Sequence, residues 1–491
     1  MADRSPDAPP HHRVVVVGAG FAGLGAAAGL LRAGVRDFVV LERAGDVGGT
    51  WRDNTYPGCA CDIPSSLYSF SFAPNPDWSR FFPRQPEILD YLRRVTDDLG
   101  LRPHLRLATE LLGAAWDDGS LLWRIETDRG QLTADVLVAA VGALSRPSLP
   151  GLPGLDRFGG PVFHSASWRH DVDLAGKRVA VVGTGASAVQ IVPELAPVVE
   201  RLVVVQRTPA WVGPRLDRPV SARQARLFRR FPPAQAAVRV VLYWLLELLG
   251  VGFTIDRRLL RPVEAEALRH LRRQVPDERL RAALTPHYAI GCKRILYSND
   301  YYPALQRPGV ELLASGLAEL RPGALVTTGG QVREVDAVVL ATGFAATEPA
   351  VAARITGRGG RALAAAWSGG MHAYLGTAVP GFPNLFLLVG PNSGLGHSSM
   401  VQVIESQVAH LLAGLRALAS TGARSIEVRP DAEAAYNSRL QRRLRRTVWS
   451  TGGCASWYLD EHGRNTTLWP WSTWRFRLRA RRLDRAAYVL R

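Results

Sequence analysis

RVVVVGAGFAG, residues 13–23, decides the fold, because it joins a short apolar run to three spaced glycines. The valines end at Gly18, and Gly20 and Gly23 follow at the spacing of the dinucleotide-binding turn. An alanine-rich helical stretch comes next, and a second apolar run ends at Glu42. In this order, Gly18 allows a tight turn, Gly20 admits a pyrophosphate, Gly23 lets the helix approach the strand, and Glu42 binds ribose hydroxyls. The segment therefore predicts a Rossmann-like domain for an unphosphorylated dinucleotide.

The same pattern returns in RVAVVGTGASAVQ, residues 178–190. Its fixed positions are Gly183, Gly185 and Ala188. The strand that follows ends in Arg207 and Thr208 instead of an acid. Arginine at this position favours the 2′-phosphate of NADP. One site for an unphosphorylated dinucleotide and one for NADPH together predict an enzyme that holds FAD and NADPH.

Two later apolar runs complete the domain plan. VDAVVLATGF (335–344) is expected to return from the NADPH domain, and NLFLLVGP (384–391) to supply the last FAD-domain strand. The predicted fold is α/β, with two Rossmann-like domains, the second inserted in the first, and a helical excursion. The predicted division is FAD domain, first part, 1–150; NADPH domain, first part, 151–210; helical excursion, 211–285; NADPH domain, second part, 286–372; and FAD domain, second part with a C-terminal loop, 373–491.

Composition excludes several classes of protein. The chain has 491 residues and a net charge of +17, a field that attracts phosphorylated cofactors and other anions. Its arginines lie beside no nucleic-acid-binding signature, so no nucleic-acid partner is expected. The histidines show no metal-site spacing. Four cysteines are too few for a disulfide framework and favour a reducing cytoplasm, with Cys292 read as a small buried residue.

The longest apolar run is VVLYWLLELLGVGF, residues 240–253, and it contains Glu247. At this length it is too short to span a bilayer, so a buried helix is predicted. A helix lying weakly on a membrane surface between arginines is the alternative. The opening MADRSPDAPPHHR has no apolar region of a signal peptide and is expected to be a short disordered lead.

Directly after the first fingerprint comes GGTWRDNTYPGCACD, residues 48–62. Disulfide reductases with a flavin carry a redox cysteine pair here, but this chain has Trp51 and Tyr56 at those two positions. Cys59 and Cys61 are too close in sequence for a good redox disulfide. The aromatic site instead suits a flavin that reacts with oxygen and a bulky apolar substrate.

This stretch resembles the motif of type I Baeyer–Villiger monooxygenases, Gly-Gly-x-Trp followed by Tyr-Pro-Gly-x-x-x-Asp. It matches at Gly48, Gly49, Trp51, Tyr56, Pro57, Gly58 and Asp62. The second fingerprint of that family resembles FGGPVFHSASW, through Phe158, Gly160, His164 and Trp168. One departure is Arg169, where the family usually has proline or aspartate. The resemblance covers nearly the whole chain.

The resemblance assigns roles to a second segment, GCKR, residues 291–294, which holds one of only two lysines among 60 basic residues. Arg294 would lie over the flavin and be hydrogen-bonded by Asp62. Lys293 would join Arg207 and Thr208 on the 2′-phosphate. By the same resemblance, Gly49, Thr50 and Trp51 would line the flavin, Trp457 would hold the nicotinamide from a mobile loop, and His164 would act as a hinge.

The implied reaction is insertion of one oxygen atom of O2 beside a ketone carbonyl, through a C4a-peroxyflavin, to give an ester or lactone. The expected partners are a small ketone and O2. The helical excursion and the aromatic C-terminus favour a terpenoid, steroid or long-chain ketone. Two alternatives stay open: a flavin monooxygenase that oxidises nitrogen or sulfur, and an NADPH:quinone-type dehydrogenase at a membrane surface. The sequence predicts no oligomeric state.

Overall fold

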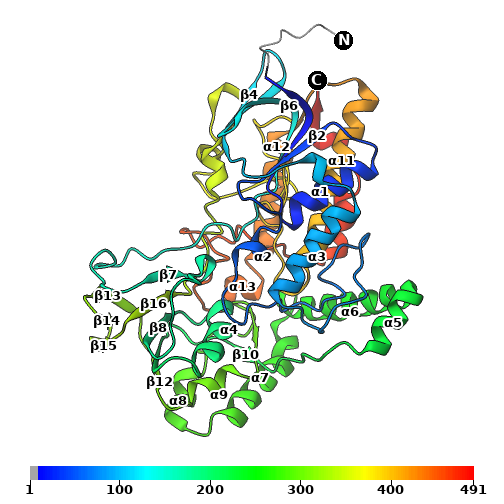
Figure 1. Ribbon diagram of the computed structural model, residues 1–491. Coiled ribbons are helices and arrows are strands. Elements are labelled where there is room, and N and C mark those ends of the chain that lie inside the picture. The colour runs from blue at the N-terminus through cyan, green and yellow to red at the C-terminus, as the bar shows by residue number, and fades with distance from the viewer. Residues whose placement is uncertain (1–8) are drawn as a thin grey trace.

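A computed structural model describes residues 9–491 and consists of two sheets stacked along one long axis, with helices around each (Figure 1). The C-terminal end of the chain lies at one end of the molecule, beside the first sheet. The second sheet lies at the opposite end, and α2 (Thr50–Asp53) lies between them. The chain thus builds two α/β bodies whose facing edges can form a shared site.

The first sheet is centred on β1 (His11–Val17). Val14 and Val16 face one core, and Val15 and Val17 face the other, because alternate side chains of a strand point to opposite sides. Strand β1 pairs in parallel with β2 (Phe38–Leu41) and β6 (Gly130–Ala139); β3 (Leu105–Arg106) pairs in parallel with β2, and β18 (Leu385–Leu387) pairs in parallel with β6. The sheet continues from β6 through β5 (Leu122–Thr127), β4 (Leu111–Asp117) and β17 (Ile355–Thr356). Its first core packs against α1 (Phe21–Arg32), α3 (Gln85–Asp98) and α11 (Met400–Thr421).

The second sheet is fully parallel, in the order β12-β9-β8-β16-β7. Its strands are β7 (Val162–His164), β8 (Arg178–Val182), β9 (Arg201–Val205), β12 (Val310–Leu313) and β16 (Ala337–Leu340). Helices α4 (Ala186–Leu195) and α9 (Tyr301–Leu305) cover it, and an antiparallel sheet follows in β13 (Leu317–Arg321), β14 (Ala324–Thr327) and β15 (Val332–Glu334). The predicted fold class, with a second dinucleotide-binding fold inserted in the first, is confirmed.

Two boundaries differ from the sequence analysis. The chain returns to the first sheet earlier than residue 373, because β17 already pairs with β4 and Leu363 in α10 (Leu363–Ala366) packs in the second core of that sheet. The predicted disordered lead is also shorter, since residues 11–13 open β1; residues 1–8 lie outside the described part of the chain. Both differences come from short edge segments whose pairing partners are distant in sequence.

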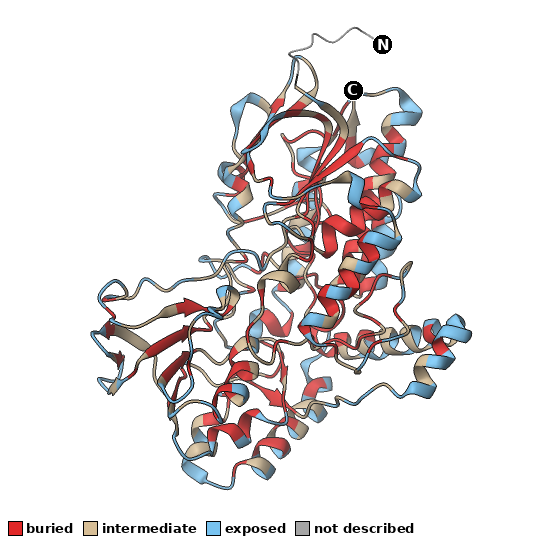
Figure 2. Cartoon of the chain, viewed as in Figure 1, coloured by how far each residue is buried: buried red, intermediate tan, exposed pale blue. Residues whose placement is uncertain are grey.

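The excursion is helical, as expected, but its longest helix is not buried. After β10 (Val212–Gly213), which pairs with β11 (Leu296–Tyr297), come α5 (Ala222–Arg230), α6 (Pro232–Thr254), α7 (Arg261–Gln274) and α8 (Glu278–Leu284). Helices α5 and α6 project sideways from the molecule, and much of α6 is exposed (Figure 2). By length and composition α6 could cross a membrane, and only 22% of its most apolar window is buried. The prediction of a buried helix at residues 240–253 is therefore wrong.

The C-terminal part packs against the first body and against the excursion. It contains α12 (Pro430–Leu444), α13 (Val448–Thr451), α14 (Thr473–Ala480) and the pair β19 (Ile426–Val428) and β20 (Tyr488–Leu490). Just after α13, Cys454 forms a disulfide with Cys292 of the GCKR segment. Cys292 is buried, as predicted, but it is not a lone thiol. The bond was missed because its two cysteines are 162 residues apart.

Candidate functional site

The turn after β1 can be built only with glycine at two of its positions. Gly18 has φ +103°, and a Cβ there would lie 2.7 Å from the carbonyl oxygen of Ala140. A Cβ on Gly23 would lie 1.7 Å from the carbonyl oxygen of Gly18. Helix α1 begins at Phe21, directly after this turn, and Gly20 at its N-cap has no side chain that could accept a hydrogen bond. The first backbone N–H groups of the helix are therefore left for a ligand.

A second glycine turn faces this helix start. Gly49 has φ +52°, and a Cβ on it would be 3.1 Å from the Cα of Gly20. Thr50 and Trp51 open α2 directly after it. The two backbones thus form a cradle without side chains, and that shape fits the diphosphate of a dinucleotide.

Glu42 closes the other side of the cradle. Its buried carboxylate accepts hydrogen bonds from the backbone N–H of Ala19, at 2.8 Å, and of Ala44, at 3.0 Å. Arg52 approaches the same carboxylate at 3.1 Å. These contacts hold Glu42 at the end of β2, the position from which an acid binds a ribose.

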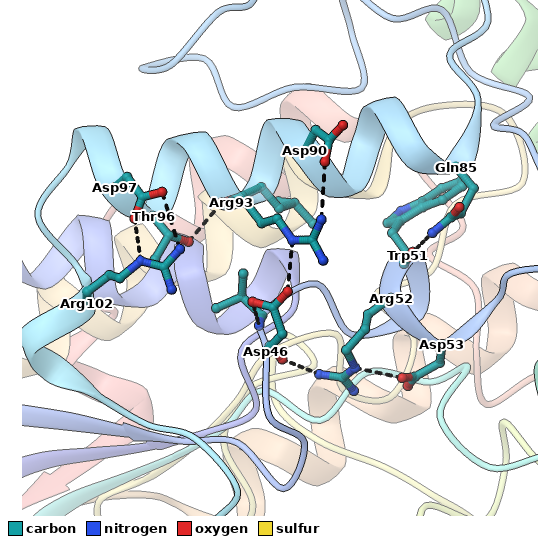
Figure 3. A network of polar contacts seen from close by, with 12 residues as sticks. Asp46, Trp51, Arg52, Asp53, Gln85, Asp90, Arg93, Thr96, Asp97 and Arg102 are labelled. Atoms are coloured by element: carbon teal, nitrogen blue, oxygen red, sulfur yellow. Dashed lines mark hydrogen bonds and ion pairs between the residues drawn. The ribbon is translucent and has the colours of Figure 1, made fainter.

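A polar network fixes α2 against α3 (Figure 3). Arg93 donates to the Asp46 carboxylate at 2.8 Å, and Arg52 donates to the Asp46 carbonyl at 2.6 Å. Gln85 donates to the carbonyl of Trp51, while the Trp51 indole N–H donates to the Tyr68 hydroxyl at 3.0 Å. The indole is thereby held in one orientation between the two bodies.

Arg294 and Asp62 form the central ion pair, although they are 232 residues apart. The guanidinium donates through Nε to Oδ2 at 2.6 Å and through Nη2 to Oδ1 at 2.7 Å. Each side chain keeps about a quarter of its surface exposed, at 27% and 28%. Burial alone would raise the pKa of Asp62, but the charge and hydrogen bonds of Arg294 outweigh it and hold that pKa below its usual value. Burial would lower the pKa of Arg294, and Asp62 reverses this and raises it.

Tyrosines surround this pair, and sequence reasoning missed them. Tyr458 is buried, and its burial raises its pKa to about 12 although the charge of Arg294 opposes the shift. Tyr297 is also within electrostatic reach of both charges, and burial raises its pKa above the usual value. The run SWYLDEHGRNTTLWP contains Tyr458, but only the fold brings that residue to Arg294.

The second cradle repeats the first. Gly183 has φ +118°, and a Cβ there would be 2.5 Å from the carbonyl oxygen of Ala341. Gly185 precedes α4, and a Cβ on it would meet nothing within 4 Å. Ala188 is fully buried where α4 packs on the sheet. A small residue is therefore required at that position, and the cradle fits a second dinucleotide.

Two cations lie beside the second cradle. Arg207 is exposed beyond β9, and the neighbouring Thr208 carbonyl accepts from the Thr184 hydroxyl at 2.7 Å. Burial lowers the pKa of Lys293, and the charge of Arg207 lowers it further. Among residues 9–491, neither cation forms a salt bridge, and Lys293 Nζ lies 5.2 Å from the centroid of the Tyr288 ring. Two unpaired like charges brought this close suit a phosphate dianion.

The motif turn also joins the two bodies. The Tyr56 hydroxyl donates to Oε1 of Gln190 in α4 at 3.0 Å, and Gln190 Nε2 donates to the Ala60 carbonyl at 3.0 Å. Gly58 has φ +80°, and a Cβ there would lie 2.7 Å from the Gln190 carbonyl oxygen. The Tyr-Pro-Gly turn therefore seats the first body on the helix that opens the second cradle.

The remaining predicted residues lie near this site or at its hinge. Trp457 is 47% exposed and contacts Tyr458, with ring centroids 4.5 Å apart. His164 ends β7, is buried, and accepts through Nδ1 from the backbone N–H of Ala166 at 3.0 Å. Cys59 and Cys61 are both free thiols. The structure thus brings Arg294, Asp62 and Lys293 together from the two bodies, and leaves Trp457 on a more exposed loop.

Comparison with known proteins agrees with this geometry. The family described as flavin-binding monooxygenase-like matches residues 11–237. A Baeyer–Villiger monooxygenase of Streptomyces coelicolor is 55% identical over 98% of this chain and 93% of its own length. Cyclohexanone monooxygenase from Rhodococcus sp. Phi1 bound to NADP+ superimposes with a TM-score of 0.88, at 29% identity over 99% of this chain and 100% of that chain. The structure of OTEMO with FAD and NADP also gives 0.88, at 27% identity over 99% and 100%.

Proposed function

The chain belongs to the Baeyer–Villiger monooxygenases, and from that membership we propose which of its residues carry out the reaction. It is an FAD- and NADPH-dependent enzyme that inserts one oxygen atom of O2 beside a ketone carbonyl, giving an ester or lactone. When bound, FAD supplies the redox chemistry: it takes a hydride from NADPH and activates O2. The protein supplies binding, orientation and charge.

The first cradle would hold FAD. The residues assigned to it are Gly18, Gly20, Gly23, Glu42, Gly49, Thr50 and Trp51. The absence of side chains between the two glycine turns and the free N–H groups at the start of α1 support this assignment. The anchored Trp51 ring would keep water away from the flavin.

We assign the central catalytic role to Arg294. A guanidinium keeps its positive charge at any pH at which a protein is folded. A fixed cation at the reacting centre stabilises the negative charge that develops on oxygen when the ketone is attacked, by the same logic as an oxyanion hole. The exposed quarter of the Arg294 side chain leaves it accessible to substrate.

Asp62 would position Arg294. Its two oxygens bind Nε and Nη2, so the guanidinium can rotate only if both hydrogen bonds break. The remaining N–H groups stay free to face the substrate. The carboxylate also offsets part of the cost of burying the cation.

NADPH would bind at the second cradle through Gly183, Gly185 and Ala188. Its 2′-phosphate would be bound by Arg207, Thr208 and Lys293, and Trp457 would cover the nicotinamide end. The unpaired cations Arg207 and Lys293 support this assignment. We propose the domain division given by the sequence, with the return to the FAD domain moved to about residue 350, where the chain rejoins the first sheet.

The observation that carries the proposal is the two-fold hydrogen bond between Arg294 and Asp62, which are 232 residues apart in the sequence. The test measures NADPH oxidation, O2 consumption and product mass for wild type and Arg294→Ala with a panel of ketones. We expect the variant to keep FAD and oxidise NADPH, but to form hydrogen peroxide instead of ester. Ester formation at the wild-type rate would refute the role of Arg294. Oxidation of sulfides or amines without any ketone product would favour the alternative monooxygenase.

We further propose that the substrate is a bulky apolar ketone. The aromatic surroundings of the ion pair, including Tyr297 and Tyr458, support an apolar substrate. No nucleic-acid partner is proposed.

A further inference from the structure

Helix α6 carries its apolar side chains on the outside of the molecule. The exposed fractions range from 53% to 70% for Val240, Val241, Trp244, Leu245 and Leu248. At 100° per residue, these five positions fall within an arc of about 140° on one side of the helix. We call this arc the outer stripe. A contiguous exposed stripe of this kind marks an interaction surface.

The opposite side of α6 packs against the protein: Leu246 lies against the core of the first body, and two polar side chains are anchored by hydrogen bonds. Gln235 donates to the carbonyl of Asn75 at 2.6 Å. Arg239 donates to the carbonyls of Ser66 and Ser69, both at 2.9 Å. These bonds define the rotation of the helix about its axis, and this rotation turns the outer stripe to solvent.

About two turns after Arg239, Glu247 lies at the edge of the outer stripe and forms a second set of contacts with the protein. Its carboxylate accepts from the backbone N–H of Thr473 at 3.0 Å and lies 3.3 Å from Nε2 of His397. Glu247 and His397 are both buried. Turning the outer stripe inward would break these contacts and leave buried polar groups without partners, which is costly. The outward orientation is therefore a stable feature of the fold.

Unpaired arginines stand at both ends of the outer stripe. Before it come Arg223, Arg226 and Arg230, and after it come Arg257, Arg258 and Arg261; all are exposed. None of the six forms a salt bridge with another residue in 9–491. Because α5 and α6 project from the body of the protein (Figure 2), the arginines of α5 and the outer stripe lie on a part of the molecule that can approach an extended surface.

We propose that α6 docks on the surface of an anionic lipid bilayer. The outer stripe would insert among the head groups and upper acyl chains, while the flanking arginines bind lipid phosphates. The charge pattern favours lipid over a second copy of this chain, whose own arginines would repel it. The helix lies in the surface and does not cross the bilayer, because crossing would require breaking the contacts of Arg239 and Glu247.

Helix α6 also contacts the segment that carries Arg294. Phe253, near its C-terminal end, packs so closely that a Cβ on Gly291 would be 2.7 Å from its ring. Gly291 opens the segment that carries Arg294. If the proposed function is correct, docking would place the active site beside ketones dissolved in the membrane; this consequence rests on the proposed function.

The test is flotation of the FAD-loaded full chain with vesicles of phosphatidylcholine alone and of phosphatidylcholine mixed with phosphatidylglycerol. We expect binding to the anionic vesicles, weakened by salt. The double variant Leu245→Asp and Leu248→Asp should bind about 100-fold more weakly, because it lacks two leucines that would be buried in the lipid on docking. The matched control Leu216→Asp changes a leucine that is 76% exposed outside α6, and it should bind like wild type.

Equal binding to both kinds of vesicle, or unchanged binding by the double variant, would overturn the proposal. A different result would also overturn it: wild type is a dimer by light scattering without vesicles, the double variant is a monomer, and wild type does not bind vesicles. The double variant should form ester from a water-soluble ketone at the wild-type rate in vesicle-free buffer. Because flotation needs no turnover, a wild-type enzyme that binds vesicles but makes no ester would contradict the proposed function and leave the docking proposal standing.

Discussion

Replacing Asp62 by asparagine tests how the reactive arginine is positioned. Asparagine has nearly the same shape, but its amide offers one oxygen acceptor where the carboxylate offers two. Arg294 donates two hydrogen bonds to Asp62, at 2.6 and 2.7 Å. In the variant, one of these bonds loses its acceptor, and the other keeps an acceptor oxygen that is no longer charged. The guanidinium keeps its own charge and gains freedom to rotate.

The size of the effect follows from these two bonds. A hydrogen bond to a charged group contributes about 1.5–3 kcal/mol, and the pair is mostly buried. Losing one such bond at the reacting centre should slow ester formation by about 10–100-fold. The rate of NADPH oxidation should change by less than about twofold, because Asp62 is not among the groups expected to bind NADPH.

The assay follows NADPH loss, hydrogen peroxide and ester in the same reaction. We expect peroxide to rise as ester falls, so that the sum of the two still equals the NADPH consumed. The matched control is Asp336→Asn, which disrupts the exposed pair with Arg178. If Asp62→Asn made ester at the wild-type rate, or lost NADPH oxidation and ester formation equally, the positioning role would be refuted.

Three further predictions concern neighbouring residues. Lys293→Ala should raise the KM for NADPH by about 10–100-fold and leave the KM for NADH nearly unchanged, because only NADPH has the 2′-phosphate; equal weakening of both would contradict the assignment. In the wild type, burial and Arg207 lower the pKa of Lys293, so its charge is lost as pH rises through that lowered value. The preference for NADPH over NADH should therefore begin to fall at a lower pH than an ordinary lysine would give, and a ratio of the two kcat/KM values that stays constant as pH rises would count against this. Cys454→Ser should lower the free energy of unfolding by about 2–4 kcal/mol in denaturant titrations, because it removes the disulfide. The control Cys59→Ser changes a free thiol and should lower this free energy less. No loss for Cys454→Ser, or equal losses for both variants, would show that the disulfide does not form.

The sequence by itself determined the local parts of this protein. Each dinucleotide cradle depends on glycines spaced within a few residues, so the strand, the turn and the helix start could be predicted directly from RVVVVGAGFAG and RVAVVGTGASAVQ. Positive φ values at Gly18 and Gly183 show the physical reason, since a side chain at either position would collide with a carbonyl oxygen. The acid after one cradle and the arginine after the other are equally local signals.

Resemblance to a family, and not spacing, linked Arg294 to Asp62 before the structure was known. Only the tertiary structure places Tyr458 beside that pair and joins Cys292 to Cys454, because contacts between residues this far apart, 162 positions for the two cysteines, leave no periodic trace in the sequence.

Helix α6 shows the same limit most clearly. Its apolar residues predict a helix that avoids water, but their spacing is the same whether the apolar side meets a core or the outside. The direction was decided by partners elsewhere in the chain, Asn75 and Thr473 among them, which bind Gln235 and Glu247 and so hold these side chains inward. Since buried polar groups must be hydrogen-bonded, the fold settled the orientation by satisfying Gln235, Arg239 and Glu247, and left Leu245 and Leu248 outside.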